Sequence, residues 1–471
     1  MEVLIINPPI AGKIKYIREG RCEQRLSSFQ YMMPPISLVS IAALLEKNGF
    51  RVKVLECIGK NLQFTDVQRE IAEFKPRLLI INFSTATYFN DLKFVGLVRN
   101  LTSAHLTAIG VHVSALAQET LSQSSLDSVV RGEPEAACLD LALAILQRKG
   151  LERVNNLSFK DKQGVVNNPG GYFIEDLNAL PFPARHLIDN NCYSLPTTSR
   201  PYTMVISSRG CPYKCIFCTA RQYYGEKPRF RDPKNIITEV EEIVNRFKIK
   251  DIVMWADTFT LNRDLVMEFC ALIKSRNLKF NWMCNSRVDK VDEEMLVAMR
   301  KAGCRGIAYG IESGVQSILD SVKKGVSVKQ IEKAFSLTLK AKIPSLGHVI
   351  LGLPGETRET IKQTLNFLKK LNCDYAQFYC AIPFPGTDFY SLAKENGWLV
   401  TDDWSKFELN QAIIRTPFLS EEELRLYRKR AYASFYLRPG YIFKKMGRLI
   451  PMCFSGKAGR KIFSFLKDWI V

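Results

Sequence analysis

Three closely spaced cysteines dominate the chemistry that this sequence could perform. Cys211, Cys215 and Cys218 form a C-x3-C-x2-C pattern in SSRGCPYKCIFCTARQ, directly after the apolar run YTMVIS. Structural zinc sites normally use four protein ligands, and a thioredoxin-like pair would leave Cys211 without a role. An iron–sulfur cluster is normally held by four thiolates. Three thiolates on a 4Fe–4S cluster would leave one iron open to a second molecule.

The cysteine loop resembles that of the radical S-adenosylmethionine (SAM) superfamily. In that family the open iron binds SAM, and one electron cleaves SAM to methionine and a 5′-deoxyadenosyl radical. The resemblance implies that the three cysteines hold a catalytic 4Fe–4S cluster and that Phe217 lies near the adenine. It also implies an anaerobic setting, because such a cluster is labile to oxygen, and an electron donor such as flavodoxin or ferredoxin.

The chain after residue 200 alternates strand-like and helical stretches, which must position this loop. The pattern predicts an incomplete (β/α)6 barrel over residues 200–395, with chemistry at the carboxyl ends of its strands. The cysteine loop follows the first of these strands. The strands are expected at 202–208, 251–257, 280–286, 306–312, 345–352 and 375–383.

Residues at the ends of the second and third strands match SAM contacts of the family. Asp257 in ADTFT corresponds to a contact with the methionine moiety, although Ala256 replaces the first of the usual two acids. Ser286 and Arg287 in CNSRVD follow the third strand, and an arginine there could hold the SAM carboxylate through two hydrogen bonds. The alternative for Arg287 is an ordinary arginine on the protein surface.

The ends of the later strands extend the resemblance. Glu312 in YGIESG suits the ribose hydroxyls, and Gly347 and Gly352 in GHVILGLPGET would let the backbone approach adenosine. PFPGT at 383–387 matches the turn after the sixth strand. Several matches in order, one per strand end, favour the family more strongly than any single glycine-rich turn.

The first 150 residues predict a different α/β domain. Strand-like runs at 2–9, 51–57, 77–87, 106–112 and 126–133 alternate with helical patterns. This alternation predicts a doubly wound, flavodoxin-like parallel sheet with ligands at the carboxyl ends of its strands. The stretches PPISLVSIAALLEKNGFRVKVLE, VHVSALAQETL and VVRGEPE resemble the cobalamin-binding domain found before many radical SAM barrels.

This second resemblance implies cobalamin as a further cofactor, with contacts after the third and fourth strands. Ser84 and Thr85 in NFSTAT could contact the corrin amides or the nucleotide tail, or could simply cap the strand end. The D-x-H-x-x-G motif, whose histidine ligates cobalt in some cobalamin enzymes, is absent. In the radical SAM group the loop of His112 often lines the cobalamin site without ligating the metal, and we expect the same here.

The composition favours a cytoplasmic protein with anionic partners. The 471 residues carry a formal net charge of +19. Thirteen cysteines without regular spacing do not suit a secreted disulfide framework. The first residues, MEVLIINPP, indicate a strand rather than a signal peptide. No uncharged apolar run reaches the ~18 residues of a membrane span.

The remaining segments are a predicted hairpin and linker over 151–199 and a helical, basic C-terminal region over 396–471. In RKIFSFLKDWIV apolar residues recur at helical spacing with basic residues opposite, which suits a helix on the inner face of an anionic membrane. An amphipathic helix packed on the barrel would explain the same pattern. The aromatic residues of the tail share the apolar face, so nucleic acid is not expected as a partner.

These features identify the chain as a member of the cobalamin-dependent radical SAM enzymes. The resemblance implies methylation of an unactivated carbon: the adenosyl radical abstracts hydrogen, the substrate radical takes a methyl group from methylcobalamin, and a second SAM remethylates the cobalamin. The basic tail favours a lipid or isoprenoid over other small-molecule substrates. Two alternatives remain, a radical SAM enzyme that forms rings, oxidises or couples carbons, and a non-catalytic cobalamin-binding sensor.

Overall fold

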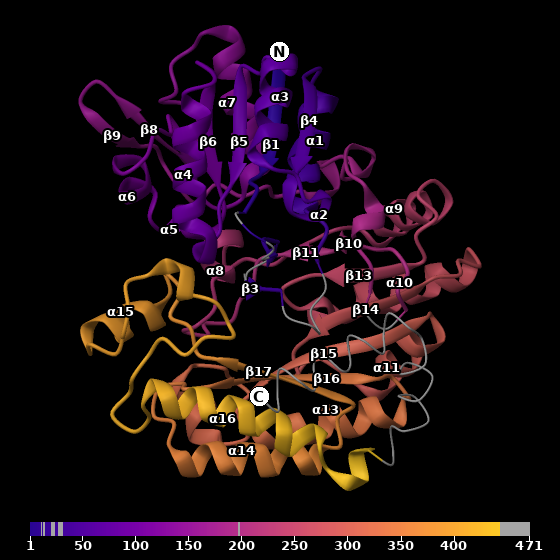
Figure 1. Cartoon of the computed structure of the whole chain (residues 1–471). Helices are drawn as coiled ribbons and strands as arrows, with labels where there is room; N and C mark the ends of the chain where they lie inside the picture. Colours follow the sequence, from indigo (N-terminus) through magenta and orange to yellow (C-terminus); the bar gives the residue numbers. More distant parts are fainter. Residues whose placement is uncertain (11, 13–14, 20–23, 27–31, 196–197, 443–471) are drawn as a thin grey trace.

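Five parallel strands from the first 130 residues form the larger part of the upper sheet in Figure 1. The computed structural model describes residues 1–10, 12, 15–19, 24–26, 32–195 and 198–442. Within these residues the sheet has seven strands in the order β4-β1-β5-β6-β7-β8-β9. The parallel strands are β1 (Glu2–Asn7), β4 (Arg51–Glu56), β5 (Leu78–Asn82), β6 (His105–Ile109) and β7 (Ser128–Val130).

The order of the parallel strands is the flavodoxin-like order, which confirms the expected fold of this unit. The strands are apolar runs such as LLIIN, as a parallel sheet buried on both faces requires. The helices α1 (Ile36–Lys47) and α7 (Pro134–Gln147) pack together on one face. The helices α3 (Phe64–Phe74) and α4 (Tyr88–Arg99) cover the other face.

A hairpin and a linker lead from this sheet to the barrel. The strand β8 (Leu157–Asp161) pairs antiparallel with β7, and β9 (Gly164–Asn167) pairs antiparallel with β8. In the linker, the buried Arg185 donates to the carbonyl of Met204 at 2.7 Å and to the carboxylate of Glu239 at 2.5 Å. The linker is therefore fixed to the first strand and the first helix of the barrel.

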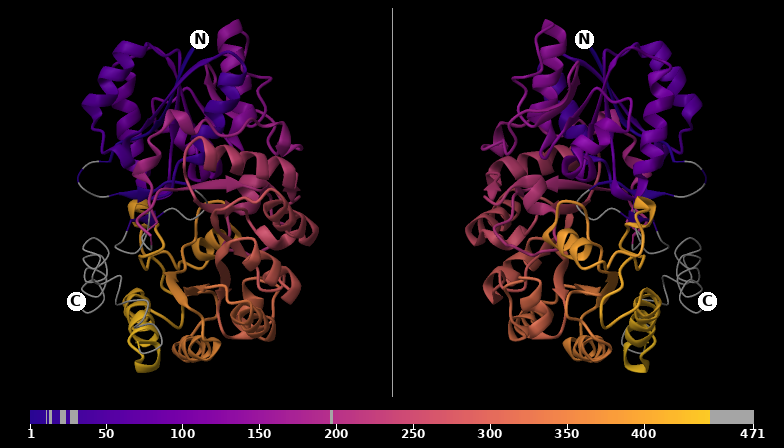
Figure 2. Two further views of the ribbon diagram at one scale, coloured as in Figure 1. Left: turned by 90° about the vertical axis from the view of Figure 1, so that its right-hand side faces the viewer. Right: turned by 90° about the vertical axis from the view of Figure 1, so that its left-hand side faces the viewer.

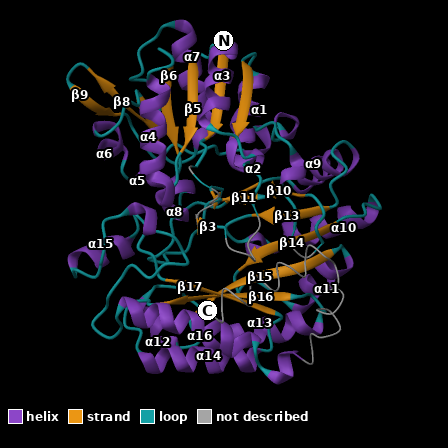
Figure 3. Ribbon diagram, viewed as in Figure 1, coloured by secondary structure: helices purple, strands orange, loops and turns teal. Residues whose placement is uncertain are grey.

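Six parallel strands of the described residues form the second sheet, in the order β10-β13-β14-β15-β16-β17. Since strands and helices alternate along the chain, the helices lie on the outer side of the curved sheet (Figure 3). This is the incomplete (β/α)6 barrel expected from the sequence. The strands are β10 (Tyr202–Ile206), β13 (Asp251–Trp255), β14 (Asn281–Ser286), β15 (Cys304–Glu312), β16 (Ser345–Leu351) and β17 (Tyr375–Cys380). The main outer helices are α9 (Pro233–Asn245), α10 (Arg263–Ser275), α11 (Glu293–Lys301), α13 (Val328–Lys340) and α14 (Arg358–Leu371).

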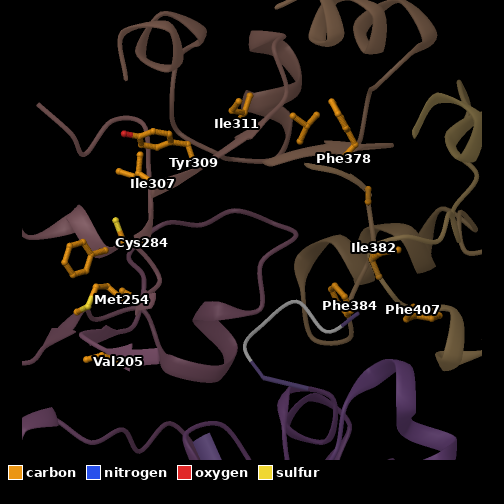
Figure 4. Close-up of a cluster of buried hydrophobic side chains, with 14 of the residues drawn as sticks. Val205, Met254, Cys284, Ile307, Tyr309, Ile311, Phe378, Ile382, Phe384 and Phe407 are labelled. Atoms are coloured by element: carbon orange, nitrogen blue, oxygen red, sulfur yellow. The ribbon is translucent and has the colours of Figure 1, made fainter. Parts of the chain in front are cut away.

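The two faces of the barrel sheet differ in burial. Side chains such as Cys284, Tyr309 and Phe378 point to the helices and are fully buried in the core cluster of Figure 4. The residues between them on β14, β16 and β17 keep partial exposure, which produces an alternating pattern along each strand. Successive side chains of a strand point to opposite faces, so the partly exposed set lies on the inner face of the barrel.

The chain after the barrel returns to the first unit before its last described helix. The helix α15 (Asp388–Glu395) and the turn η6 (Trp404–Lys406) precede α16 (Glu421–Tyr436), which packs on α14 and β17. The turn η6 contacts α4 and the turn before it, so it reaches the first unit, which lies above the barrel in both views of Figure 2. The predicted amphipathic segment RKIFSFLKDWIV lies outside the described residues. Of the helices that are described, none combines the length and apolar character needed to cross a membrane.

Candidate functional site

The loop that carries Cys211, Cys215 and Cys218 is held by backbone contacts from several sides. It runs from β11 (Ser208–Arg209) to α8 (Ala220–Tyr224). The amide of Cys211 donates to the carbonyl of Gly225 at 3.1 Å. Gly210 has φ 88°, and a Cβ at this position would lie 2.3 Å from the carbonyl oxygen of Lys227. Glycine is therefore required for the loop to fold directly before its first cysteine.

The three cysteine residues of the loop are partly exposed, whereas seven of the eight other cysteines that the structure describes are buried. In the part of the chain that the structure describes, no three His, Cys, Asp or Glu side chains converge where a single ion could sit. The thiolates of a 4Fe–4S cluster bind different iron atoms, so they need not converge on one point. Three accessible thiols on one anchored loop therefore fit such a cluster as a set of donors.

A buried ion pair lies beside the central cysteine. Glu312 ends β15 in the left-handed region at φ 59°, and its carboxylate accepts a hydrogen bond from Lys324 Nζ at 2.6 Å. Burial raises the pKa of the Cys215 thiol, while the positive charge of Lys324 opposes this shift. Burial alone would lower the pKa of Lys324, but the charge of Glu312 raises it. Lys324 thus keeps its positive charge next to the cysteine loop.

Arg287 is buried and not the surface arginine that the sequence left open. Its guanidinium carbon lies 3.4 Å from the ring centroid of Tyr213, a residue of the cysteine loop. Its Nη2 donates to the carbonyl of Lys324 at 3.0 Å and its Nε donates to Asp289 at 2.9 Å. The end of β14, the cysteine loop and the segment after β15 therefore meet at Arg287.

The other predicted SAM-contact residues lie around the same strand ends. Asp257 follows β13 and is half-buried. Ser286 is buried at the end of β14 and donates to the carbonyl of Arg287 at 3.0 Å. Phe217 packs against the main core from within the cysteine loop. The barrel thus brings Asp257, Ser286 and Glu312 to one edge, as the strand pattern predicted.

The two predicted glycines differ in what their missing side chains would meet. A Cβ at Gly347 would lie 2.5 Å from Cδ1 of Ile311, on the helix-facing side of β16. Gly352 follows β16 with φ 95°, and its amide donates to the buried carboxylate of Glu356. Gly352 is therefore set by a left-handed turn, and Gly347 by close packing behind the sheet.

The hydroxyls predicted to contact cobalamin are buried at the carboxyl edge of the first sheet. Ser84 Oγ lies 2.7 Å from Thr87 Oγ1, which donates to Asp91 at 2.6 Å. Asp91 also pairs with Arg18, a residue of the N-terminal segment. Thr85 lies in the same turn and is likewise buried. The hydroxyls of Ser84 and Thr87 therefore belong to a buried side-chain network with Asp91, and neither caps the turn or helix that it precedes.

His112 is buried at the same edge with both ring nitrogens unpaired among the described residues. Its ring centroid lies 4.3 Å from that of Tyr88 and 4.9 Å from that of Trp404 in η6. Burial lowers the pKa of His112 to about 3, so the ring is neutral. A buried imidazole without hydrogen bonds is the feature of this edge that best fits a bound group such as cobalamin.

The cysteine loop and the edge of the first sheet are neighbours in space. The helix α8 follows the cysteine loop, and it packs on α5 (Val111–Ala115), which carries His112. Val111, Tyr223 and Tyr224 form the small hydrophobic cluster between them. The predicted cluster site and the predicted cobalamin edge therefore face the same junction.

Several residues of this junction were not predicted from the sequence. Lys324 and Trp404 come from segments that only the fold brings to the site, and Tyr213 lies within the cysteine loop but was not singled out. Arg209 lies two residues before Cys211, and it pairs with the buried Glu133 and Glu135 of the first unit. The acids of VVRGEPE and Arg209 carry opposite charges, but only the fold shows that they are buried together.

Comparisons with known proteins agree with this architecture. The family model "Radical SAM superfamily" matches residues 205–368, and "B12 binding domain" matches residues 25–142. An uncharacterized methyltransferase from Pyrococcus horikoshii is 30% identical over 446 residues, which cover 94% of each chain. An anaerobic magnesium-protoporphyrin IX monomethyl ester cyclase from Rubrivivax gelatinosus is 25% identical, covering 88% of this chain and 81% of its own.

A solved structure shows the same fold. It is that of the cobalamin-dependent S-adenosylmethionine radical enzyme OxsB with aqua-cobalamin and S-adenosylmethionine bound. The match has a TM-score of 0.75 at 16% identity and covers 99% of this chain and 70% of that chain. The arrangement of a flavodoxin-like sheet before a partial barrel is therefore shared across the whole length of the chain.

Proposed function

The chain belongs to the radical SAM superfamily, in the group whose barrel follows a B12-binding domain, and from this premise we propose that it methylates an unactivated carbon. Its cofactors are a 4Fe–4S cluster, SAM and cobalamin. The observation that carries the proposal is the packing of α8 on α5, because it sets the three-thiol loop beside the edge of the B12-binding domain.

The residues of the chain have distinct roles in this proposal. Cys211, Cys215 and Cys218 hold the cluster, and Asp257 and Glu312 lie where they could bind the polar groups of SAM. When bound, the three cofactors supply a carbon-centred radical and a transferable methyl group. The protein aligns these groups and keeps water and oxygen from them, which is the usual contribution of the polypeptide in cofactor enzymes.

A non-methylating reaction is the second candidate. It is favoured by one observation, the 25% identity to a cyclase over most of both chains. Ring formation would use the same cluster and SAM without incorporation of a methyl group. The two candidate reactions therefore differ in whether the methyl carbon of SAM is found in the product.

The substrate and the electron donor belong to the proposal as well. A lipid or isoprenoid substrate is supported by the basic composition of the C-terminal segment, through its expected attraction to anionic membranes. A flavodoxin or ferredoxin would supply the electron that SAM cleavage requires. The formal charge of +19 would favour approach of such an acidic protein.

The test is anaerobic reconstitution with hydroxocobalamin, a reductant and SAM that carries a deuterated methyl group, so that every methyl group on cobalamin comes from labelled SAM. The substrate source is an extract of cells that lack the gene, analysed by mass spectrometry. A product heavier by the labelled methyl group supports methylation. Formation of 5′-deoxyadenosine together with an unlabelled new product would favour ring formation or oxidation, and no SAM cleavage at all would reject both.

A further inference from the structure

A chain of three polar side chains spans two strands of the barrel sheet. Gln377 and Tyr379 alternate on β17, and His348 lies on the neighbouring strand β16. His348 is paired in register with Gln377, and Tyr379 lies two residues further along. Diagonal neighbours of this kind are within reach of aromatic side chains. The rings of His348 and Tyr379 are stacked, with centroids 5.7 Å apart.

These three side chains point to the inner face of the barrel. The residues next to them in sequence, Gly347 and Phe378, face the outer helices: a Cβ at Gly347 would meet Ile311, and Phe378 packs on Tyr432 of α16. Successive residues of a strand point to opposite faces. The side chains of His348, Gln377 and Tyr379 are partly exposed. Phe378 is buried, and so is Ile311, the residue that a Cβ at Gly347 would meet.

The direction of the hydrogen bonds follows from the chemistry of the partners. The hydroxyl of Tyr379 bonds to Oε1 of Gln377, and a carbonyl oxygen can only accept, so Tyr379 is the donor. Tyr379 has a single proton, so its oxygen must accept in the contact with Nδ1 of His348, at 3.1 Å. His348 therefore carries its proton on Nδ1, and Nε2 is left with a lone pair.

His348 lies one strand away from the ion pair of Glu312 and Lys324. No described residue donates a hydrogen bond to Nε2. Gly310 is the residue of β15 in register with His348, and a Cβ there would meet Glu312 and Nζ of Lys324. Burial lowers the pKa of His348, with opposing contributions from Glu312 and Lys324. The ring is thus a neutral acceptor one strand away from the buried ion pair.

We propose that Gln377, Tyr379 and His348 form a recognition site on the inner face of the barrel, in which His348 Nε2 accepts a hydrogen bond from an O–H or N–H group of a bound molecule. The inference rests on the proposed function in one respect, that SAM and the methyl acceptor bind at this face. The donor is therefore a hydroxyl or amine of SAM, or a hydroxyl or amide of the substrate.

Two substitutions remove different parts of this site and one serves as a matched control. His348→Phe keeps a planar ring and removes the acceptor. Tyr379→Phe removes the hydroxyl that fixes the proton on Nδ1. The control is Tyr309→Phe, which also removes a buried hydroxyl, bonded to Thr338 at 2.8 Å, but on the helix-facing side of the sheet. Loss of packing or of stability alone would affect all three variants.

The first measurement is the tautomer of His348 in the full chain labelled with nitrogen-15 at histidine. The chain has four histidines, and His348→Phe identifies the signal of this one. We expect the proton on Nδ1 in the unchanged protein and in Tyr309→Phe, and a shift towards Nε2 in Tyr379→Phe. A proton on Nε2 in the unchanged protein would overturn the inference.

The second measurement finds the source of the donor. Equilibrium dialysis of SAM against the anaerobically reconstituted protein should show at least tenfold weaker binding in His348→Phe and Tyr379→Phe if SAM is the donor. If the substrate is the donor, SAM binding and its cleavage without substrate stay within twofold. Transfer of the deuterated methyl group to the extract then falls at least tenfold in both variants.

The inference fails if both variants equal Tyr309→Phe in SAM binding and in methyl transfer. A protein that transfers no label even without substitutions would reject methylation as the function. In that case the tautomer of His348 and the dialysis of SAM still test the inference. If His348→Phe and Tyr379→Phe then bind SAM as well as the unchanged protein does, the site has no ligand and the inference is overturned.

Discussion

Arg209 donates both terminal nitrogens to the carboxylate of Glu135, at 3.0 and 2.5 Å, and so joins the segment before the first cluster cysteine to the B12-binding domain. Nη1 also reaches Glu133, which accepts a further hydrogen bond from Arg229 at 2.7 Å. All four side chains are buried. The ion pairs thus hold two domains together next to the loop that must bind the cluster.

Replacing Arg209 with Met should destabilise the protein by ~3–5 kcal/mol, because it leaves the buried Glu135 without a partner. The free energy of unfolding, measured by chemical denaturation, should decrease. The iron content of the protein after reconstitution should decrease as well. The control is Arg263→Met, which removes an arginine that pairs with Asp292 and Glu294 on the surface. Such exposed ion pairs contribute little to the free energy of unfolding. Equal effects of the two substitutions would contradict a special role of the domain contact.

The buried Glu356 should make stability depend on pH. Burial raises its pKa from 4.5 to about 8. The folded state then binds the proton more tightly than the unfolded state, so stability falls as pH rises from 4.5 to about 8, by about 1.4 kcal/mol per pH unit. Glu356→Gln should weaken this pH dependence, and its gain in stability over the unchanged protein should be largest at pH 8. Thermal unfolding at pH 5 and pH 8 measures it, with the exposed Glu359→Gln as control.

Replacing Cys211, Cys215 and Cys218 together with Ala should remove the iron–sulfur absorbance and abolish formation of 5′-deoxyadenosine. Cys270→Ala should leave both intact, because that residue lies on α10 with its side chain buried in the core. Iron analysis and chromatography of the nucleoside products provide the readouts. Full cluster content in the triple variant would disprove the assignment of these ligands.

His112→Ala should leave the cobalt electron paramagnetic resonance spectrum of bound cobalamin unchanged, if the ring lines the site without ligating the metal. The total amount of bound cobalamin should fall, because the ring packs between Tyr88 and Trp404 and its loss opens a gap. Thr107→Val, a buried change at the centre of the same sheet, is the control for loss of stability. A changed hyperfine pattern on His112→Ala alone would instead show ligation.

Truncation after Ile442 should abolish co-sedimentation with anionic phosphatidylserine vesicles. Each basic residue near such a surface contributes about 1 kcal/mol, and salt screens the attraction. The truncation keeps the contacts of Arg438 and Tyr441 with the barrel. The alternative surface is α14, whose Lys362, Lys369 and Lys370 are exposed. Binding that survives truncation but is lost when these lysines become glutamates would contradict a role of the tail.

The fold was predictable because its signals are local. Alternating apolar and helical runs gave both sheets, and the residues expected at the strand ends of the barrel, such as Asp257 and Glu312, lie there. Lys324 was not predictable, because its contact depends on the left-handed turn at Glu312. The burial of His112 was also not predictable from the sequence, because Trp404, which packs on its ring, lies almost 300 residues further along the chain. The roles of these residues remain predictions.

The return of the chain to the first domain has a consequence for biosynthesis. Trp404 is made long after His112, Ser84 and Thr85, and domains generally begin to fold during synthesis from the N-terminus. The edge of the B12-binding domain is therefore uncovered on the ribosome until η6 emerges. In the finished protein the indole of Trp404 packs against His112 and covers part of this edge. This edge is therefore completed only by a segment that is synthesised after the whole of the barrel.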